Sequence, residues 1–237
     1  MAGIALIAIA AALAAQQPDF ELLYRQALQQ REQALGESAL KTRESARDLA
    51  LYLTKRGEYT RAEPYVSAAL ELADSLADAT ALHNWAVKLE ESNVLLAEKM
   101  YRKTLAIRAK ALTPLDPDLA TTRLNLSLLL IARGEAEAAQ LASAALRSFE
   151  NRSGAMDARV GAACGVLGTA AAIKGNVAAA EKLFRRALVI SVKAWGSDAP
   201  ETANALENLA DLLQQTGRAS AARPLLDRAQ GIRSRSR

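Results

Sequence analysis

The sequence predicts an all-α protein built as a solenoid of antiparallel helix pairs. Three observations indicate this fold class. Hydrophobic residues make up 51% of the 237 residues and aromatic residues only 4%, so the apolar content is mostly alanine and leucine, which favours close-packed helices. Glycine (12) and proline (6) are scarce, and no long stretch alternates as a β-strand does. A turn residue also recurs at a long, nearly constant period, as in stacked helix pairs.

The first predicted element is a single helix over residues 19–36. Residues 21–28 of this helix align with residues 181–188, which belong to the second helix of a later pair. The array therefore begins with a half repeat.

Five helix pairs are predicted to follow, and each contains a tight turn. The segments around these turns are 49–70, 84–105, 125–146, 166–188 and 208–230. The turn residues are Gly57, Asn93, Gly134, Gly175 and Gly217, at spacings of 36 to 42 residues. Glycine and asparagine enter the left-handed conformation most cheaply, so each of these residues is expected to end one helix and reverse the chain.

Small residues at fixed offsets from the turns predict where the helices cross. Seven residues before the turns lie Ala50, Ala86, Ser127, Gly168 and Ala210. Four or five residues after the turns lie Ala62, Ala97, Ala138, Ala180 and Ala222. Because only a small side chain lets two helix axes approach closely, both helices of each pair are expected to pack through these positions.

These turn and packing columns resemble the tetratricopeptide repeat, and the 41- to 42-residue spacing is similar to its kinesin light chain type. The linking segment 196–203 matches that type closely and 113–120 matches it partly. The resemblance implies a right-handed superhelical solenoid over residues 18–237, with the half repeat and five pairs. The departures are Asn93 in place of glycine, Val166 where asparagine is usual, and no proline-containing link before the fourth pair.

Residues 1–15 form an uncharged apolar run that ends in small residues, which is typical of a secretory signal peptide. The run is too short to span a membrane, and no lysine or arginine precedes it. The alternative is an extra helix that covers the end of the fold. If the leader is cleaved, we expect a bacterial-type periplasmic or secreted protein; otherwise we expect a cytoplasmic one.

The sequence contains no motif of an enzyme or a cofactor site, including the phosphate-binding loop, the dinucleotide-binding loop and the zinc protease motif. The single histidine, His83, is expected to be a polar residue on a helix face, and the single cysteine, Cys164, a core residue. We therefore expect no catalysis, no metal, no cofactor and no small-molecule substrate.

Two basic stretches, around Lys99–Lys103 and Lys182–Arg186, suggest a nucleic-acid binder as an alternative. The net charge is only +4, Glu98 and Glu181 offset part of each stretch, and no aromatic residues alternate with the basic ones to stack on bases. We expect solvated helix faces and no nucleic-acid partner.

The tetratricopeptide resemblance implies that the first helix of each pair lines a concave groove, with ligand-facing residues ten, nine and six positions before the turn. The expected groove residues are Arg47, His83, Asn84, Val87, Leu124, Asn125, Leu128, Thr169, Glu207, Asn208 and Asp211. In the kinesin light chain type, asparagine at the middle position holds an extended peptide backbone. The alternative is that these asparagines only tie neighbouring helices together.

The third and fourth pairs are expected to form an apolar patch in this groove, flanked by polar ends. Its residues are Leu124, Leu128, Ile131, Ala162, Gly165, Ala172 and Ile173. The alternative is that the patch is ordinary core. The sequence thus predicts a non-enzymatic scaffold, exported if the leader is cleaved, that binds a protein or peptide segment; the alternatives are a cytoplasmic adaptor and a basic nucleic-acid binder.

Overall fold

The computed structural model describes residues 19–235, and every regular element in this range is helical. The chain divides into two compact units, Met1–Lys88 and Leu89–Arg237. The expected leader, residues 1–15, lies outside the described residues.

The described part of the first unit holds the predicted single helix and the helices after it. These are α2 (Phe20–Leu35), α3 (Leu40–Lys55), α4 (Tyr59–Ala62), the 3-10 helix η1 (Glu63–Tyr65), α5 (Val66–Leu72) and α6 (Leu76–Leu89). The segment after Gly57 was expected to be one helix, and this expectation is wrong. Pro64 lies inside η1, where it cannot donate a backbone hydrogen bond, so the helix is interrupted between α4 and α5.

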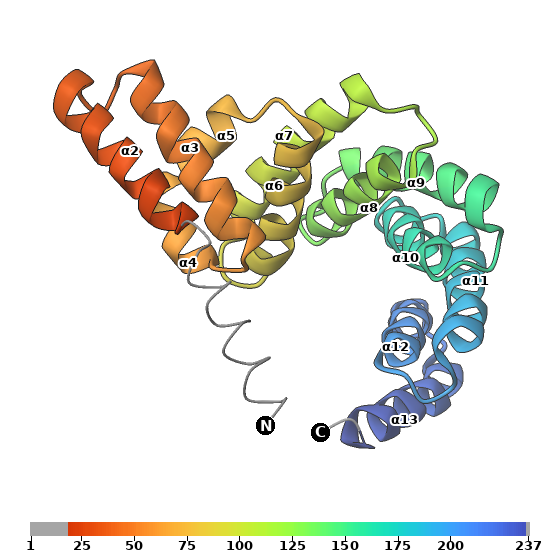
Figure 1. The fold of residues 1–237 in the computed structure, drawn as a ribbon. Coiled ribbons are helices and arrows are strands. Elements are labelled where there is room, and N and C mark those ends of the chain that lie inside the picture. The colour runs from red at the N-terminus through yellow and green to blue at the C-terminus, as the bar shows by residue number, and fades with distance from the viewer. Residues whose placement is uncertain (1–18, 236–237) are drawn as a thin grey trace, which may run out of the picture. The chain divides into compact units, whose positions relative to one another are not determined.

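The second unit contains seven helices between Leu89 and Arg235. They are α7 (Val94–Ala111), α8 (Pro117–Ile131), α9 (Glu137–Ser153), α10 (Ala158–Ile173), α11 (Val177–Trp195), α12 (Pro200–Gln215) and α13 (Ala219–Arg235). Consecutive helices pack as the pairs α8–α9, α10–α11 and α12–α13 (Figure 1). The next pair stacks on the previous one through α9 against α10 and α11 against α12, as in a solenoid.

The glycine turns were predicted correctly. Gly57, Gly134, Gly175 and Gly217 all have φ between 72° and 77°, in the left-handed region that costs glycine nothing. The chain also turns before Asn93, at residues 90–92, but the left-handed conformation expected for Asn93 is wrong, because its φ is −149°. Its side chain instead accepts a hydrogen bond from the backbone N–H of Leu96 at 3.2 Å, so Asn93 caps the start of α7.

The small-residue columns also lie where the sequence predicted. Ala50, Ala86, Ser127 and Ala210 have no exposed surface, and neither do the five alanines that follow the turns. Gly168 makes the closest approach, since a Cβ atom there would lie 2.6 Å from the ring of Phe184 on α11. These positions are helix-crossing points, and side-chain volume is tightly limited there.

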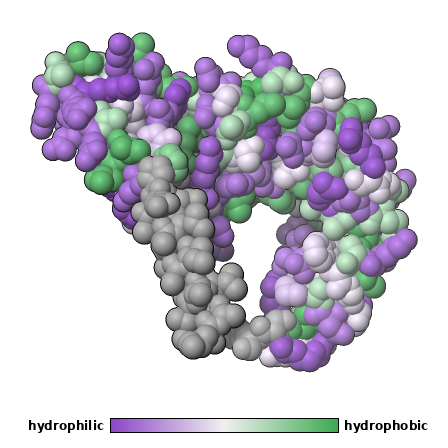
Figure 2. Space-filling view, viewed as in Figure 1, coloured by the Kyte–Doolittle hydropathy of each residue, from purple (hydrophilic) through white to green (hydrophobic). Residues whose placement is uncertain are grey.

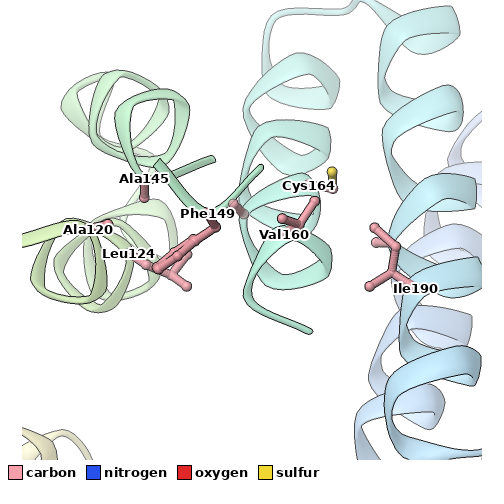
Figure 3. Close-up of a cluster of buried hydrophobic side chains, with 9 residues drawn as sticks. Ala120, Leu124, Ala145, Phe149, Val160, Cys164 and Ile190 are labelled. Carbon is pink, nitrogen blue, oxygen red and sulfur yellow. The ribbon is translucent and has the colours of Figure 1, made fainter. Parts of the chain in front are cut away.

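Clusters of buried apolar residues join the helices of the second unit. One joins α8, α9, α10 and α11 around Phe149 and Ile190 (Figure 3). A second joins α11, α12 and α13 around Phe184, and a third joins α12 and α13 around Leu206 and Ile232. The core thus continues from pair to pair and fixes α10, α11 and α12 against one another.

Candidate functional site

A cleft runs along the second unit between α10 and α12, with α11 beneath it. Its larger part has a volume of about 570 Å³ and adjoins a smaller part of about 250 Å³. Thr169, Phe184 and Asn208 line both parts, so the two form one continuous space. The volume lies in the range of sites that bind small ligands or several side chains of a peptide.

Small residues on α10 create this space. Gly161 and Gly168 face α11, where added Cβ atoms would lie 3.0 Å from Ile190 and 2.6 Å from Phe184. Gly165 faces the cleft instead, because its Cβ would meet nothing closer than the Asn208 amide nitrogen, at 4.0 Å. The glycines of α10 therefore do two different things: two let α11 approach, and one leaves the cleft open.

The two sides of the cleft differ in chemistry. Apolar residues come from the end of α8 and from α10, and Phe184 and Ala187 of α11 form the floor. The α12 side carries carboxylates and amides: Glu201, Asn204, Glu207, Asn208, Asp211 and Gln215. The exposed side of α12 is accordingly mostly hydrophilic or neutral in colour (Figure 2). Such a cleft can bury apolar groups on one side and accept hydrogen bonds on the other.

Two exposed apolar side chains mark the ends of the cleft. Trp195, the last residue of α11, is 54% exposed and lines the larger part. Ile173, the last residue of α10, is 59% exposed and lines the smaller part. Large apolar groups left in water beside a cleft are typical of interaction sites.

The arginine in the cleft, Arg159, is held by a carboxylate beside it. Arg159 donates to Asp157 Oδ1 at 2.9 Å and to Asp157 Oδ2 at 2.8 Å, and its guanidinium lies 4.5 Å from the centre of the Phe149 ring. The hydrogen bonds from Arg159 lower the pKa of Asp157 to about 2. Asp157 also caps α10, because it accepts from the backbone N–H of Arg159 at 2.9 Å.

Five of the eleven expected groove residues line this cleft together: Leu128, Thr169, Glu207, Asn208 and Asp211. Leu128 is 46% exposed, although Leu124, one helical turn earlier, is only 4% exposed. The assignment of Leu124 to the groove is therefore corrected. Leu124 points toward Phe149 within the core cluster, where Val160 and Cys164 of α10 also pack (Figure 3).

Asn125 contacts a neighbouring helix and does not line the cleft. Its amide nitrogen donates to the hydroxyl of Tyr101 on α7 at 3.4 Å, and that hydroxyl donates to Glu90. Burial, with the adjacent Glu90 carboxylate, raises the pKa of Tyr101 above its ordinary value. This contact supports the alternative in which Asn125 ties two helices together.

The remaining four expected residues belong to the first unit. Arg47 donates to Asp48 Oδ1 at 2.8 and 3.0 Å and to the carbonyl of Leu72 at 3.4 Å. His83 is buried, whereas Asn84 and Val87 on the same helix are exposed. The cleft of the second unit is built without them.

Several lining residues were not predicted as groove residues, including Arg159, Phe184, Ser191 and Trp195. Arg159, Ser191 and Trp195 lie outside the columns counted from the turns, near helix ends or on the second helix of a pair. The sequence carries one signal for Trp195, a large aromatic residue directly before the Gly196 that ends α11.

Arginines of the two basic stretches are engaged in ion pairs. Arg102 pairs with Glu98 at 2.7 Å and with Glu137 at 2.8 Å, and Arg186 pairs with Glu150 at 2.5 Å. The pair with Glu98 lies within α7, whereas the pairs with Glu137 and Glu150 link α9 to α7 and to α11. The stretches therefore present less free positive charge than their sequence alone indicates.

The described residues offer no group of three or more histidine, cysteine or acidic side chains that could hold a metal ion. Cys164 is fully buried, and burial raises the pKa of its thiol. No helix in the described part of the chain has the length and apolar character needed to cross a membrane.

Comparison with known proteins agrees with the helical-repeat fold. Residues 161–235 match the tetratricopeptide repeat family. No curated protein sequence matches the chain.

Several solved structures have a similar fold. BtubC (BKLC) from P. vanneervenii is 20% identical, with a TM-score of 0.62 over 91% of this chain and 90% of its own. A kinesin light chain candidate from Podosopora anserina with nearly identical TPR-like repeats is 21% identical, with a TM-score of 0.55 over 82% of this chain and 96% of its own. MamA from MSR-1 is 19% identical, with a TM-score of 0.50 over 82% and 98%. Residues 161–235 thus match the tetratricopeptide repeat family, and the chain has a fold similar to that of kinesin light chain-like tetratricopeptide repeat proteins.

Proposed function

We propose that this chain is a non-enzymatic scaffold that holds an extended segment of a partner protein in the cleft between α10 and α12. The fold suggests a protein-interaction scaffold. The cleft between α10 and α12 supports this proposal, because it offers a surface that a partner segment can occupy. The observation that carries the proposal is the open space left by Gly165, lined by apolar residues on one side and amides and carboxylates on the other.

The side chains of the cleft suit a peptide. Asn208 lies opposite Gly165, and its side-chain amide has both a donor and an acceptor. The amide can therefore donate to a backbone carbonyl and accept from a backbone N–H of an extended segment. The floor formed by Phe184 and Ala187 can receive an apolar side chain. An exposed Trp195 adds a large contact area of the kind that dominates binding energy at interfaces.

Selection from a display library of random twelve-residue peptides tests the proposal. Wild-type protein should enrich a set of peptides, and the cleft-filling variant Gly165→Leu should not retain them. Gly165→Ala is the matched control, because it adds only one methyl group at 4.0 Å from the nearest neighbour and leaves most of the space open. Circular dichroism and melting of all three proteins check that the fold is kept.

Failure to enrich any peptide, or equal binding of the selected peptides by wild type and Gly165→Leu, would overturn the proposal.

We extend the proposal to export: the apolar composition of residues 1–15 supports a cleaved leader and a periplasmic or secreted scaffold. Nucleic-acid binding is the weaker candidate, because ion pairs engage Arg102 and Arg186 in the basic stretches.

A further inference from the structure

The α12 side of the cleft carries more negative charge than its neighbours neutralise. Glu207 is paired, since Arg233 of α13 donates to its two carboxylate oxygens at 3.1 and 2.8 Å. Glu201 and Asp211 also line the cleft, and no side chain in the described part of the protein forms an ion pair with either of them. Two carboxylates are therefore open to a ligand.

No cation within the cleft offsets these two carboxylates. Among the described residues that line the cleft, Arg159 carries the positive charge. Its guanidinium donates to both carboxylate oxygens of Asp157. Its positive charge is balanced by Asp157, which keeps its negative charge down to a pH near 2 because its pKa is lowered. The charge that a ligand meets in the cleft is consequently negative.

The smaller part of the cleft has the shape and chemistry of a site for a basic side chain. Ile173 and Phe184 offer apolar surface, and Asp211, Asn208 and Gln215 border the same space of about 250 Å³. Lysine and arginine carry a positive charge at the end of an apolar stem, so the stem can pack on Ile173 and Phe184 while the charge reaches Asp211. The side-chain oxygens of Asn208 and Gln215 can accept further N–H bonds.

The distance between the two open carboxylates sets a spacing for the ligand. Glu201 and Asp211 are ten residues apart on α12, which corresponds to about 15 Å along the helix axis. An extended peptide advances about 3.3 to 3.6 Å per residue, so it covers this distance in about four to five residues. Between the carboxylates, Val166 and Ala205 add apolar surface to the cleft.

We infer that the cleft selects an extended peptide segment with two basic side chains four to five residues apart and apolar side chains between them. This inference rests on the proposed function, because it states the chemistry of the segment held by the same cleft. An acidic segment would bring like charges to Glu201 and Asp211, and a wholly apolar segment would leave both without a partner.

The composition of the selected peptides tests the inference separately from the proposed function. Peptides enriched by wild type should carry lysine or arginine at a separation of four to five positions with apolar residues between them. Asp211→Asn and Glu201→Gln should each weaken binding of one synthesised selected peptide by about two- to fivefold, the range of an exposed ion pair. Glu37→Gln is the matched control: it removes the same charge from an exposed turn of the first unit and should leave binding unchanged.

The charge-reversal variant Asp211→Lys gives the sharpest result. In a second selection, this variant should favour acidic residues at the position where wild type favours a basic one. Enrichment of acidic or neutral peptides by wild type, or no effect of Asp211→Asn and Asp211→Lys, would overturn the inference and leave the proposed function intact. Enrichment of no peptide at all would overturn both.

Discussion

Replacing each of two glycines of α10 with alanine should change the stability of the protein in opposite directions. Gly165 and Gly168 both lie inside the helix, so replacing either with alanine should stabilise the helix by about 0.5 to 1 kcal/mol through lower backbone entropy in the unfolded chain. The surroundings differ. A Cβ at Gly165 meets its nearest atom at 4.0 Å, whereas a Cβ at Gly168 lies 2.6 and 2.7 Å from two ring carbons of Phe184.

The clash at Gly168 cannot be relieved cheaply. Phe184 is only 4% exposed and packs among Leu209, Leu212 and Leu213, so its ring must displace core side chains or move into the cleft. Overpacking of this kind costs about 1 to 3 kcal/mol, which exceeds the gain in helix propensity. We expect Gly165→Ala to raise the free energy of unfolding by about 0.5 to 1 kcal/mol and Gly168→Ala to lower it by about 1 to 2 kcal/mol.

Thermal melting followed by circular dichroism at 222 nm measures the difference. For a chain of this size, 1 kcal/mol corresponds to about 2 to 4 °C in Tm. The double variant Gly168→Ala with Phe184→Leu is the control for the cause, because the smaller side chain should recover part of the loss. Equal shifts for Gly165→Ala and Gly168→Ala, or no recovery in the double variant, would refute the assignment of Gly168 to the helix crossing.

Three further predictions concern the cleft, its support and the leader. Leu128→Asp should abolish binding of a selected peptide and leave the Tm nearly unchanged, because Leu128 is exposed. Leu124→Ala should instead lower the free energy of unfolding by about 2 to 5 kcal/mol, because it leaves a cavity beside Phe149. A Leu128 variant that unfolds would place that side chain in the core. The pKa of Asp157 is lowered from 3.8 to about 2, so the stabilising contribution of its carboxylate should be complete above pH 4 and disappear as the pH falls toward 2. The difference in Tm between wild type and Asp157→Asn should therefore shrink over that range. A constant difference would contradict the ion pair with Arg159. Amino-terminal sequencing of protein from the native host should find a start near Ala15 or Gln16, and an intact Met1 or Ala2 on cytoplasmic protein would exclude export.

The turns and helix crossings could be predicted because they depend on side-chain volume and on the backbone conformations open to a residue. Both follow from the residue type alone. A glycine such as Gly175 needs no neighbour to favour a left-handed turn, and a small residue such as Ala210 at a fixed offset indicates a close approach wherever it recurs. Asn93 was misassigned because asparagine suits both a left-handed turn and a helix cap, and only the chain's path decides between them.

The cleft could be predicted only in part. The sequence indicates the helix face on which a residue lies, but not how closely a neighbouring helix packs on that face. Leu124 and Leu128 are one turn apart and share a face. Leu124 is buried in the core cluster with Phe149 and Val160, whereas Leu128 lies beside the opening that Gly165 leaves. Arg159 and Trp195 join the cleft from helix ends, so no column counted from the turns contains them.

Hydrogen–deuterium exchange with and without a selected peptide tests most directly whether the cleft between α10 and α12 is the binding site. The account predicts slower exchange in α10 (Ala158–Ile173) and α12 (Pro200–Gln215) on binding, and no comparable change in α9 (Glu137–Ser153) or α13 (Ala219–Arg235). Binding of the peptide with protection confined to α9, α13 or the first unit, and none in α10 and α12, would contradict it.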